Sequence, residues 1–289
     1  MFNEAEPEAT GEPPDLNETG SPAPAEFVLR WADNALIQSQ RLAEWTGHGP
    51  VLEEDIALAN IALDLLGQAR LLLGHAGSLM QPQRSEDELA FFRDAGAFRN
   101  FTALELPNSG VHAARGAQGD YAFTIVRHAL FSAYMLAVWE RLLGSRDATL
   151  AAIAGKAIKE TSYHWRHASD WLIKLGDGTA ESQQRMQQAL EQFLPYTNEW
   201  FAFDALDLEQ LEPQRRTPVQ PQEALATLAL AMREHWLRLL DPVMLEATLA
   251  WPAPGSLQTR GRYGLHREHL SVLLAEMQSV ARAHPGAKW

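Results

Sequence analysis

The chain of 289 residues contains no cysteine. This absence excludes disulfides, thiolate nucleophiles, zinc sites with cysteine ligands and cysteine-ligated iron–sulfur clusters. The chain also has no run of 18 uncharged apolar residues that would span a bilayer, and its N-terminus has no basic segment leading into an apolar one. We therefore expect a cytoplasmic protein with no membrane partner.

Basic residues are scarce, since 24 Lys and Arg stand against 37 Asp and Glu and give a formal net charge of −13. An acidic surface repels phosphate backbones, and no basic block offsets this locally, so nucleic acid is not an expected partner. The common glycine-rich nucleotide motifs are absent, as are Gly-x-Ser-x-Gly and His-Glu-x-x-His. The sequence therefore carries no motif of a nucleotide-binding enzyme, a serine hydrolase or a zinc protease.

What the chain does have is a helical pattern. Residues 1–25 are rich in Glu, Pro, Gly and Ser, which predicts a disordered acidic tail. From residue 26 onward apolar residues recur at intervals of three and four, interrupted by Gly and Pro clusters, so we expect an all-α domain over 26–289. Four long helices in two antiparallel hairpins form a predicted four-helix bundle: 26–45, 53–73, 120–143 and 148–175. Shorter helices are expected within 85–104, 180–193, 223–249 and 265–283, with loops at 107–119 and 212–221.

Helical bundles of this kind can hold two metal ions between one carboxylate on each of two helices and a Glu-x-x-His pair on each of the others. Counting outward from a turn near residue 49 places Asp33 opposite the region of Asp64. In the second hairpin, Glu160 is followed by His164 four residues later, and His128 lies within about a turn of Glu160 in height. The candidate ligands are therefore Asp33, Asp64, Glu160 and His164, with His128 as an additional candidate.

This candidate set is incomplete. Gly67 stands three residues after Asp64, Tyr163 stands three residues after Glu160, and Ser132 occupies the third helix where a carboxylate is wanted. Two metal ions need about four carboxylates and two imidazoles from such a bundle. The sequence therefore predicts a degenerate site, with no catalytic residue, metal or cofactor in this chain.

Other interpretations of these residues remain open. Asp64 and Asn60 can form a buried polar network with Gln68, Arg70 or Lys159 that needs no metal. Nine Trp, eleven Phe and five Tyr suit either a core or an association surface, so self-association also stays open. One helix alone supplies too few ligands for a metal site, so a further cluster is expected at the surface or an interface: His266, Glu268 and His269.

Four stretches resemble a known family. They are LAEWTGHGPVLEEDIALANIALDLLGQAR (42–70), EDELAFFRDAGAFRNFTALELPN (86–108), KAIKETSYHWRHASDWLIKLGDGT (156–179) and GRYGLHREHLSVLLAEMQ (261–278). These stretches are similar to the C-subunit family of the bacterial phenylacetyl-CoA epoxidase, a multicomponent oxygenase of phenylacetate degradation. The resemblance covers most of the chain after about residue 26. It leaves out residues 1–25 and residues 109–118, which look like an insertion.

The resemblance implies a ferritin-like subunit that is structural and non-catalytic. It implies a related catalytic subunit as partner, which holds the di-iron centre and the acyl-CoA, and a partner reductase with NADPH, flavin and iron–sulfur groups. The whole complex would add one oxygen atom of O2 across a ring bond of phenylacetyl-CoA. Two alternatives remain. One is an autonomous ferritin-like oxygenase or oxidase with a distorted metal site on Asp33, Asp64, Glu160 and His164. The other is a helical acyl-CoA-binding protein, although no clustered Arg/Lys pocket is evident.

Overall fold

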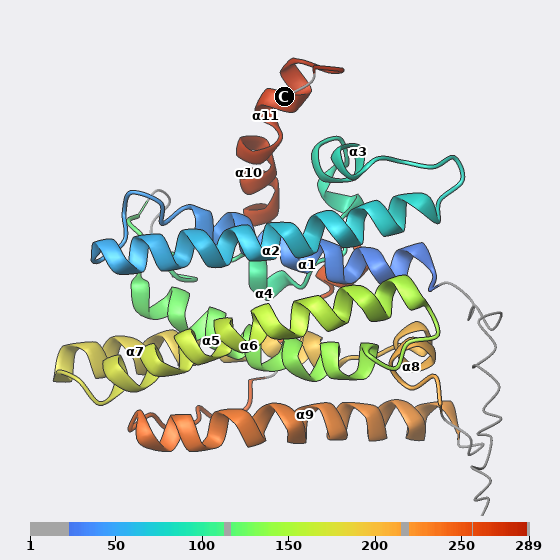
Figure 1. Ribbon diagram of the computed structural model, residues 1–289. Coiled ribbons are helices and arrows are strands. Elements are labelled where there is room, and N and C mark those ends of the chain that lie inside the picture. The colour runs from blue at the N-terminus through green and yellow to red at the C-terminus, as the bar shows by residue number, and fades with distance from the viewer. Residues whose placement is uncertain (1–22, 113–116, 215–219, 256, 288–289) are drawn as a thin grey trace, which may run out of the picture.

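The computed structural model describes residues 23–112, 117–214, 220–255 and 257–287. Within these ranges the regular elements are helices and no strand occurs, which confirms the predicted all-α class. Two antiparallel hairpins form the body of the molecule (Figure 1). Their long helices are α1 (Ala25–Ala43), α2 (Leu52–Ser78), α5 (Tyr121–Leu142) and α6 (Ala148–Gly176).

The turn between α1 and α2 is built by two glycines and one carboxylate. Gly47 has a φ of 82°, a backbone conformation that favours glycine. The carboxylate of Asp55, in the first turn of α2, accepts hydrogen bonds from the backbone N–H of Gly47 at 2.7 Å and of Gly49 at 3.1 Å. A Cβ on Gly49 would lie 2.7 Å from Asp55, so only glycine fits this close approach. This turn fixes the heights at which residues of α1 and α2 face each other.

The remaining helices surround the two hairpins. Figure 1 shows α9 lying below α5, α6 and α7, while α10 and α11 project beyond the α1–α2 pair on the side away from α9. A 3₁₀ segment, η2 (Leu194–Phe201), follows α7 directly. The bounds of these helices are α3 (Glu86–Phe91), α4 (Thr102–Glu105), α7 (Ala180–Phe193), α8 (Ala205–Leu211), α9 (Pro221–Glu246), α10 (Glu268–Met277) and α11 (Ser279–Ala283).

Two helices, α2 and α5, are long and apolar enough to cross a membrane by length and composition alone. The most apolar window of α5 is 100% buried inside the protein, as is usual for the central helix of a bundle. The corresponding window of α2 is only 44% buried. Burial therefore accounts for the apolar character of α5, whereas α2 keeps an apolar face on the outside.

Several predicted boundaries differ from the structure. Helix α2 continues past Gly74 to Ser78, and the C-terminal helix is broken at Gln278 into α10 and α11. Helix α8 was not predicted. The predicted tail, residues 1–25, lies outside the described residues except for its last three, and Ala23 is buried, with its N–H donating to Asp147 at 2.8 Å. Of the predicted loop at 107–119, residues 113–116 lie outside the described residues.

The cluster of His266, Glu268 and His269 was expected at a surface or interface, and this prediction is wrong for His266, whereas Glu268 is exposed. The His266 side chain is 3% exposed, and its Nδ1 contacts Glu105 Oε1 of α4 at 2.6 Å. Its Nε2 lies 3.0 Å from the backbone oxygen of Phe98. Imidazole and carboxylate together tie the segment before α10 to the segment between the two hairpins. The His266 side chain is therefore buried because it forms an ion pair with Glu105, which belongs to a distant part of the chain.

This pair is expected to make stability depend on pH. Burial alone would lower the pKa of His266, but the hydrogen bond and charge of Glu105 raise it above its ordinary value of 6.5. A raised folded-state pKa means that the stabilisation is complete below the unfolded-state value and is lost as pH rises through the folded-state value. In urea unfolding, the stability difference between wild type and His266→Gln should be largest at about pH 6 and shrink above about pH 7. A difference that does not change with pH would contradict this role.

Candidate functional site

Of the residues predicted as metal ligands, Asp33 lies in α1. It is fully buried, and both of its carboxylate oxygens are paired with Arg93. Oδ2 lies 3.0 Å from Nη1 of Arg93 and also accepts the N–H of Arg99 at 2.8 Å. The prediction that Asp33 faces Asp64 is therefore wrong, because its side chain points to the segment between the two hairpins. A buried carboxylate with two arginine bonds and a backbone bond is fully satisfied within the chain.

Asp64, Glu160 and His164 lie at the contact between α2 and α6, whereas the additional candidate His128 belongs to α5. Asp64 Oδ2 is 3.1 Å from His164 Nε2, and the Asp64 side chain is 41% exposed whereas that of His164 is 1% exposed. Glu160 accepts a hydrogen bond from Gln68 Nε2 at 3.0 Å and pairs with Lys156. The structure thus brings Asp64 of α2 together with His164 of α6. Glu160 lies at the next polar contact between the same two helices, and we call this row of polar contacts the seam.

The predicted polar network around Asp64 is only partly right. Gln68 does belong to the seam, but Asn60 is exposed and Arg70 binds Glu86 of α3, with Arg70 Nη2 lying 2.8 Å from its carboxylate. Gly67 and Tyr163, two of the three positions at which a metal ligand was expected to be lacking, face away from the bundle interior. Tyr163 is 45% exposed and a Cβ on Gly67 would meet no atom within 4 Å. The residues one position later, Gln68 and His164, are the ones that point inward.

A second pair on the seam was not predicted. His167 Nε2 lies 2.8 Å from Glu54 Oε2, and the Tyr121 hydroxyl donates to the same oxygen at 2.6 Å. Burial, together with the hydrogen bond to Glu54, raises the pKa of Tyr121 above its ordinary value. Glu54 is 8% exposed although it stands in the first turn of α2. The available signal was its spacing, since Glu54 lies four and seven residues before Leu58 and Ile61 of the buried face.

His128 of α5 occupies the centre of the bundle. Its ring centroid lies 5.8 Å from that of His164 and 6.4 Å from that of His167. Burial, reinforced by the two neighbouring imidazoles, holds the pKa of His128 well below 6.5, so its ring is neutral. Its Nε2 is buried without a hydrogen-bond partner. A cavity of about 10 Å³ adjoins it, lined by residues that include Gln68, Ser132 and Thr161, and this is room for about one water molecule.

These donors do not fit a two-metal centre. Such a centre wants about four carboxylates and two imidazoles directed at shared ions. Here Asp33 is paired with arginine, Glu160 with Lys156 and Gln68, and Asp64 and Glu54 each with a different imidazole. Over the described ranges, no three His, Asp or Glu side chains come close enough together to hold a metal ion. The seam is a set of carboxylate–partner pairs along the α2–α6 contact.

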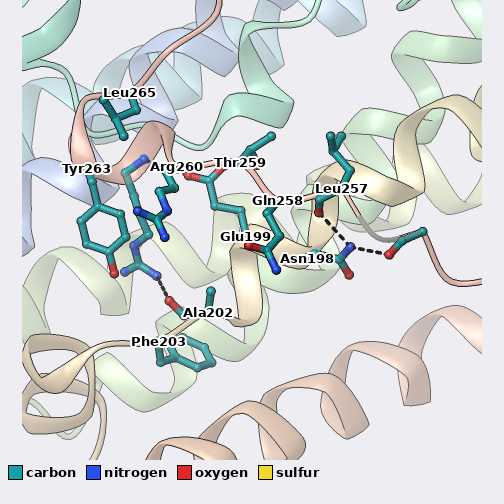
Figure 2. A pocket seen from close by; sticks show the side chains of 12 residues that line it. Asn198, Glu199, Ala202, Phe203, Leu257, Gln258, Thr259, Arg260, Tyr263 and Leu265 are labelled. Carbon is teal, nitrogen blue, oxygen red and sulfur yellow. Dashed lines mark hydrogen bonds between the residues drawn. The ribbon is translucent and has the colours of Figure 1, made fainter.

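A pocket of about 800 Å³ lies elsewhere, between η2 and residues 255 and 257–265. Figure 2 shows Glu199 beside Thr259 and Arg260 among the side chains that line this pocket. Glu199 accepts hydrogen bonds from the N–H groups of Thr102 and Arg262 and from the hydroxyl of Thr259, at 2.7–3.0 Å. None of the predicted ligands lines this pocket. Its buried acid holds the C-terminal segment in place, which is a structural task.

Two long hairpins enclosing a polar seam define an all-α, ferritin-like bundle protein. The chain belongs to the phenylacetic acid catabolic protein family, whose model matches residues 9–289. It is 43% identical over 263 residues to a protein of Escherichia coli K12 that is named as the C-subunit of 1,2-phenylacetyl-CoA epoxidase. That match covers 91% of this chain and 98% of the relative. The expected family resemblance is confirmed, but it begins at residue 9, within the segment that was expected to lie outside it.

Proposed function

We propose that this chain is the structural, non-catalytic subunit of a phenylacetyl-CoA epoxidase, and that it packs against and stabilises the subunit that carries the di-iron centre. The chain is similar to the C-subunit of such an epoxidase over almost the whole length of that relative, and this supports the proposal that the chain belongs to such a complex. The pairing of Asp33 with Arg93 supports the structural role most directly, because it removes a carboxylate that a ferritin-like metal site would need.

The proposal assigns the chemistry to partner chains. Iron and acyl-CoA belong to the catalytic subunit, and NADPH, flavin and iron–sulfur groups belong to a reductase, all in the cytoplasm. In this chain, residues 26–289 act as one ferritin-like domain without metal, catalytic or cofactor-binding residues. Its buried ion pairs and its unbroken core helix α5 give a rigid surface against which the iron-bearing bundle can pack, keeping ligand positions fixed and water out.

The test is co-expression of the chain with the other epoxidase subunits, followed by an epoxidation assay with phenylacetyl-CoA. We expect no activity from the chain alone, activity from the assembled complex, and loss of activity when the chain is omitted. Glu160→Ala should leave the rate of the complex unchanged, because Glu160 is held by a hydrogen bond from Gln68 and an ion pair with Lys156 within this chain. Epoxidation by the isolated chain, abolished by Glu160→Ala, would instead establish the autonomous oxygenase.

A further inference from the structure

Helix α2 carries a second apolar stripe that faces away from the bundle. Leu52, Ile56 and Leu63 are 72%, 52% and 64% exposed. With the half-buried Ala59 they follow the spacing 4, 3, 4, which is the a/d repeat that one helix presents to another. This outward stripe, defined as residues 52, 56, 59 and 63, accounts for the incomplete burial of α2. An exposed apolar surface of this regularity marks an interaction site.

We propose that the outward stripe is the surface on which a helix of another epoxidase subunit packs, and that this helix carries an apolar stripe of the same spacing. The inference rests on the proposed function for the existence of that subunit. The seven-residue repeat favours a helix over an extended peptide or a small molecule, because only a helix presents side chains that interdigitate with it along its length.

Gly67 points independently to something outside the chain. A glycine is tolerated within a helix but weakens it relative to alanine, so we ask what each glycine of α2 allows to come close. At Gly77 the close neighbour is internal, since a Cβ there would overlap the backbone oxygen of Arg84. At Gly67 a Cβ would meet nothing within 4 Å. Gly67 lies one turn beyond Leu63 on the outward side. Because it has no side chain, it permits the close approach of a partner helix.

Charge favours another subunit over a second copy of this chain. Each copy carries a net charge of −13, so two copies repel each other. On α6, which packs against α2, Lys159 and Arg166 are exposed, and the Arg166 guanidinium lies 5.5 Å from the ring centroid of the exposed Tyr163. A partner helix with carboxylates along its flank on the α6 side complements these cations.

The C-terminal helices also carry exposed apolar side chains. In Figure 1, α10 and α11 reach beyond α1 and α2 on the side away from α9. They carry the exposed side chains of Val272 and Val280, which are 42% and 57% exposed.

Affinity between the full chain and the co-expressed epoxidase subunits tests the assignment. We expect Leu63→Glu to weaken the complex by about 30-fold or more, because it places a charge in the centre of a desolvated helix contact. The matched control is Leu230→Glu on α9, where the leucine is 59% exposed, and it should bind like wild type. Gly67→Leu should weaken binding similarly, while its melting temperature stays equal to or above that of wild type.

The outcomes separate the two proposals. If wild type binds the other subunits and both α2 variants bind equally well, the outward stripe is not the interface and the proposed function stands. If wild type binds none of the other subunits, the proposed function itself fails. A wild-type homodimer that Leu63→Glu dissociates would overturn the assignment of the stripe to a different subunit.

Discussion

Replacing Asp207 with alanine is expected to lower the free energy of unfolding by about 3–5 kcal/mol. Asp207 of α8 is fully buried between two arginines: Arg262 Nη2 lies 2.6 Å from its carboxylate, and Arg30 Nη1 lies 3.0 Å away. The side chains of these arginines are 1% and 4% exposed. Removing the shared carboxylate leaves the buried Arg262 without its carboxylate partner, whereas Arg30 keeps Asp204 at 2.7 Å. An unpaired buried cation costs more than the pair itself contributes.

The Asp207 ion pairs join three parts of the chain that are far apart in sequence. Arg30 belongs to α1, Asp207 to α8, and Arg262 to the wall of the large pocket. Burial raises the pKa of Asp207 above its ordinary value even though both arginines lower it. The site is therefore poorly solvated, which is the condition under which an unpaired charge is most destabilising.

Urea unfolding of Asp207→Ala beside Asp87→Ala measures the effect. Asp87 stands in the first turn of α3, outside the buried networks, so its replacement should change stability by no more than about 0.5 kcal/mol. A loss below about 1 kcal/mol in Asp207→Ala would show that solvent or rearranged side chains compensate the arginines, contrary to the role given to this network.

The second large effect is expected at Asp33. Asp33→Ala should destabilise the chain by about 3–5 kcal/mol, because Arg93 would remain buried with its main counter-charge removed. Arg93 also donates to the backbone oxygen of Ala97 at 3.0 Å, and its guanidinium lies 4.2 Å from the ring centroid of Phe98. The Arg93 side chain therefore cannot become solvent-exposed without losing these other contacts.

A double-mutant cycle distinguishes a structural from a metal-binding role for Asp33. With Arg93→Met added, the double variant should be more stable than the sum of the single losses predicts, by about 1–3 kcal/mol. If the two losses in the free energy of unfolding are strictly additive, Asp33 and Arg93 contribute to stability independently of each other. Loss of bound iron on Asp33→Ala at unchanged stability would identify Asp33 as a ligand.

The long helices could be predicted because local signals set their ends. The glycines at 47 and 49 close the first hairpin, and Asp147 caps α6 by accepting from Leu150 N–H at 3.0 Å. Gly74 was expected to end α2, but a glycine is tolerated within a helix, and a Cβ there would meet only Glu86 Oε2 at 3.8 Å. Helix α8 has seven residues, too short for a periodic pattern to reveal it.

The site was harder to predict than the fold, because its partners come from elsewhere in the chain. Hairpin symmetry placed Asp33 opposite the region of Asp64, but no local pattern showed that Arg93 would reach Asp33 from the intervening segment. Asp64 and Glu160 both lie along the α2–α6 contact, and the inward positions follow them at four residues, at Gln68 and His164. A spacing of four places a side chain on the same face as readily as three, so sequence alone did not fix the register.

Our central proposal is that this chain has a structural role in the complex and binds no iron itself. Iron content of the isolated, folded chain after anaerobic loading with Fe(II) and desalting tests this most directly. We expect no stoichiometric iron, because the seam carboxylates Glu54, Asp64 and Glu160 are each paired within the chain. About two irons per chain, lost on Glu160→Ala, would contradict it.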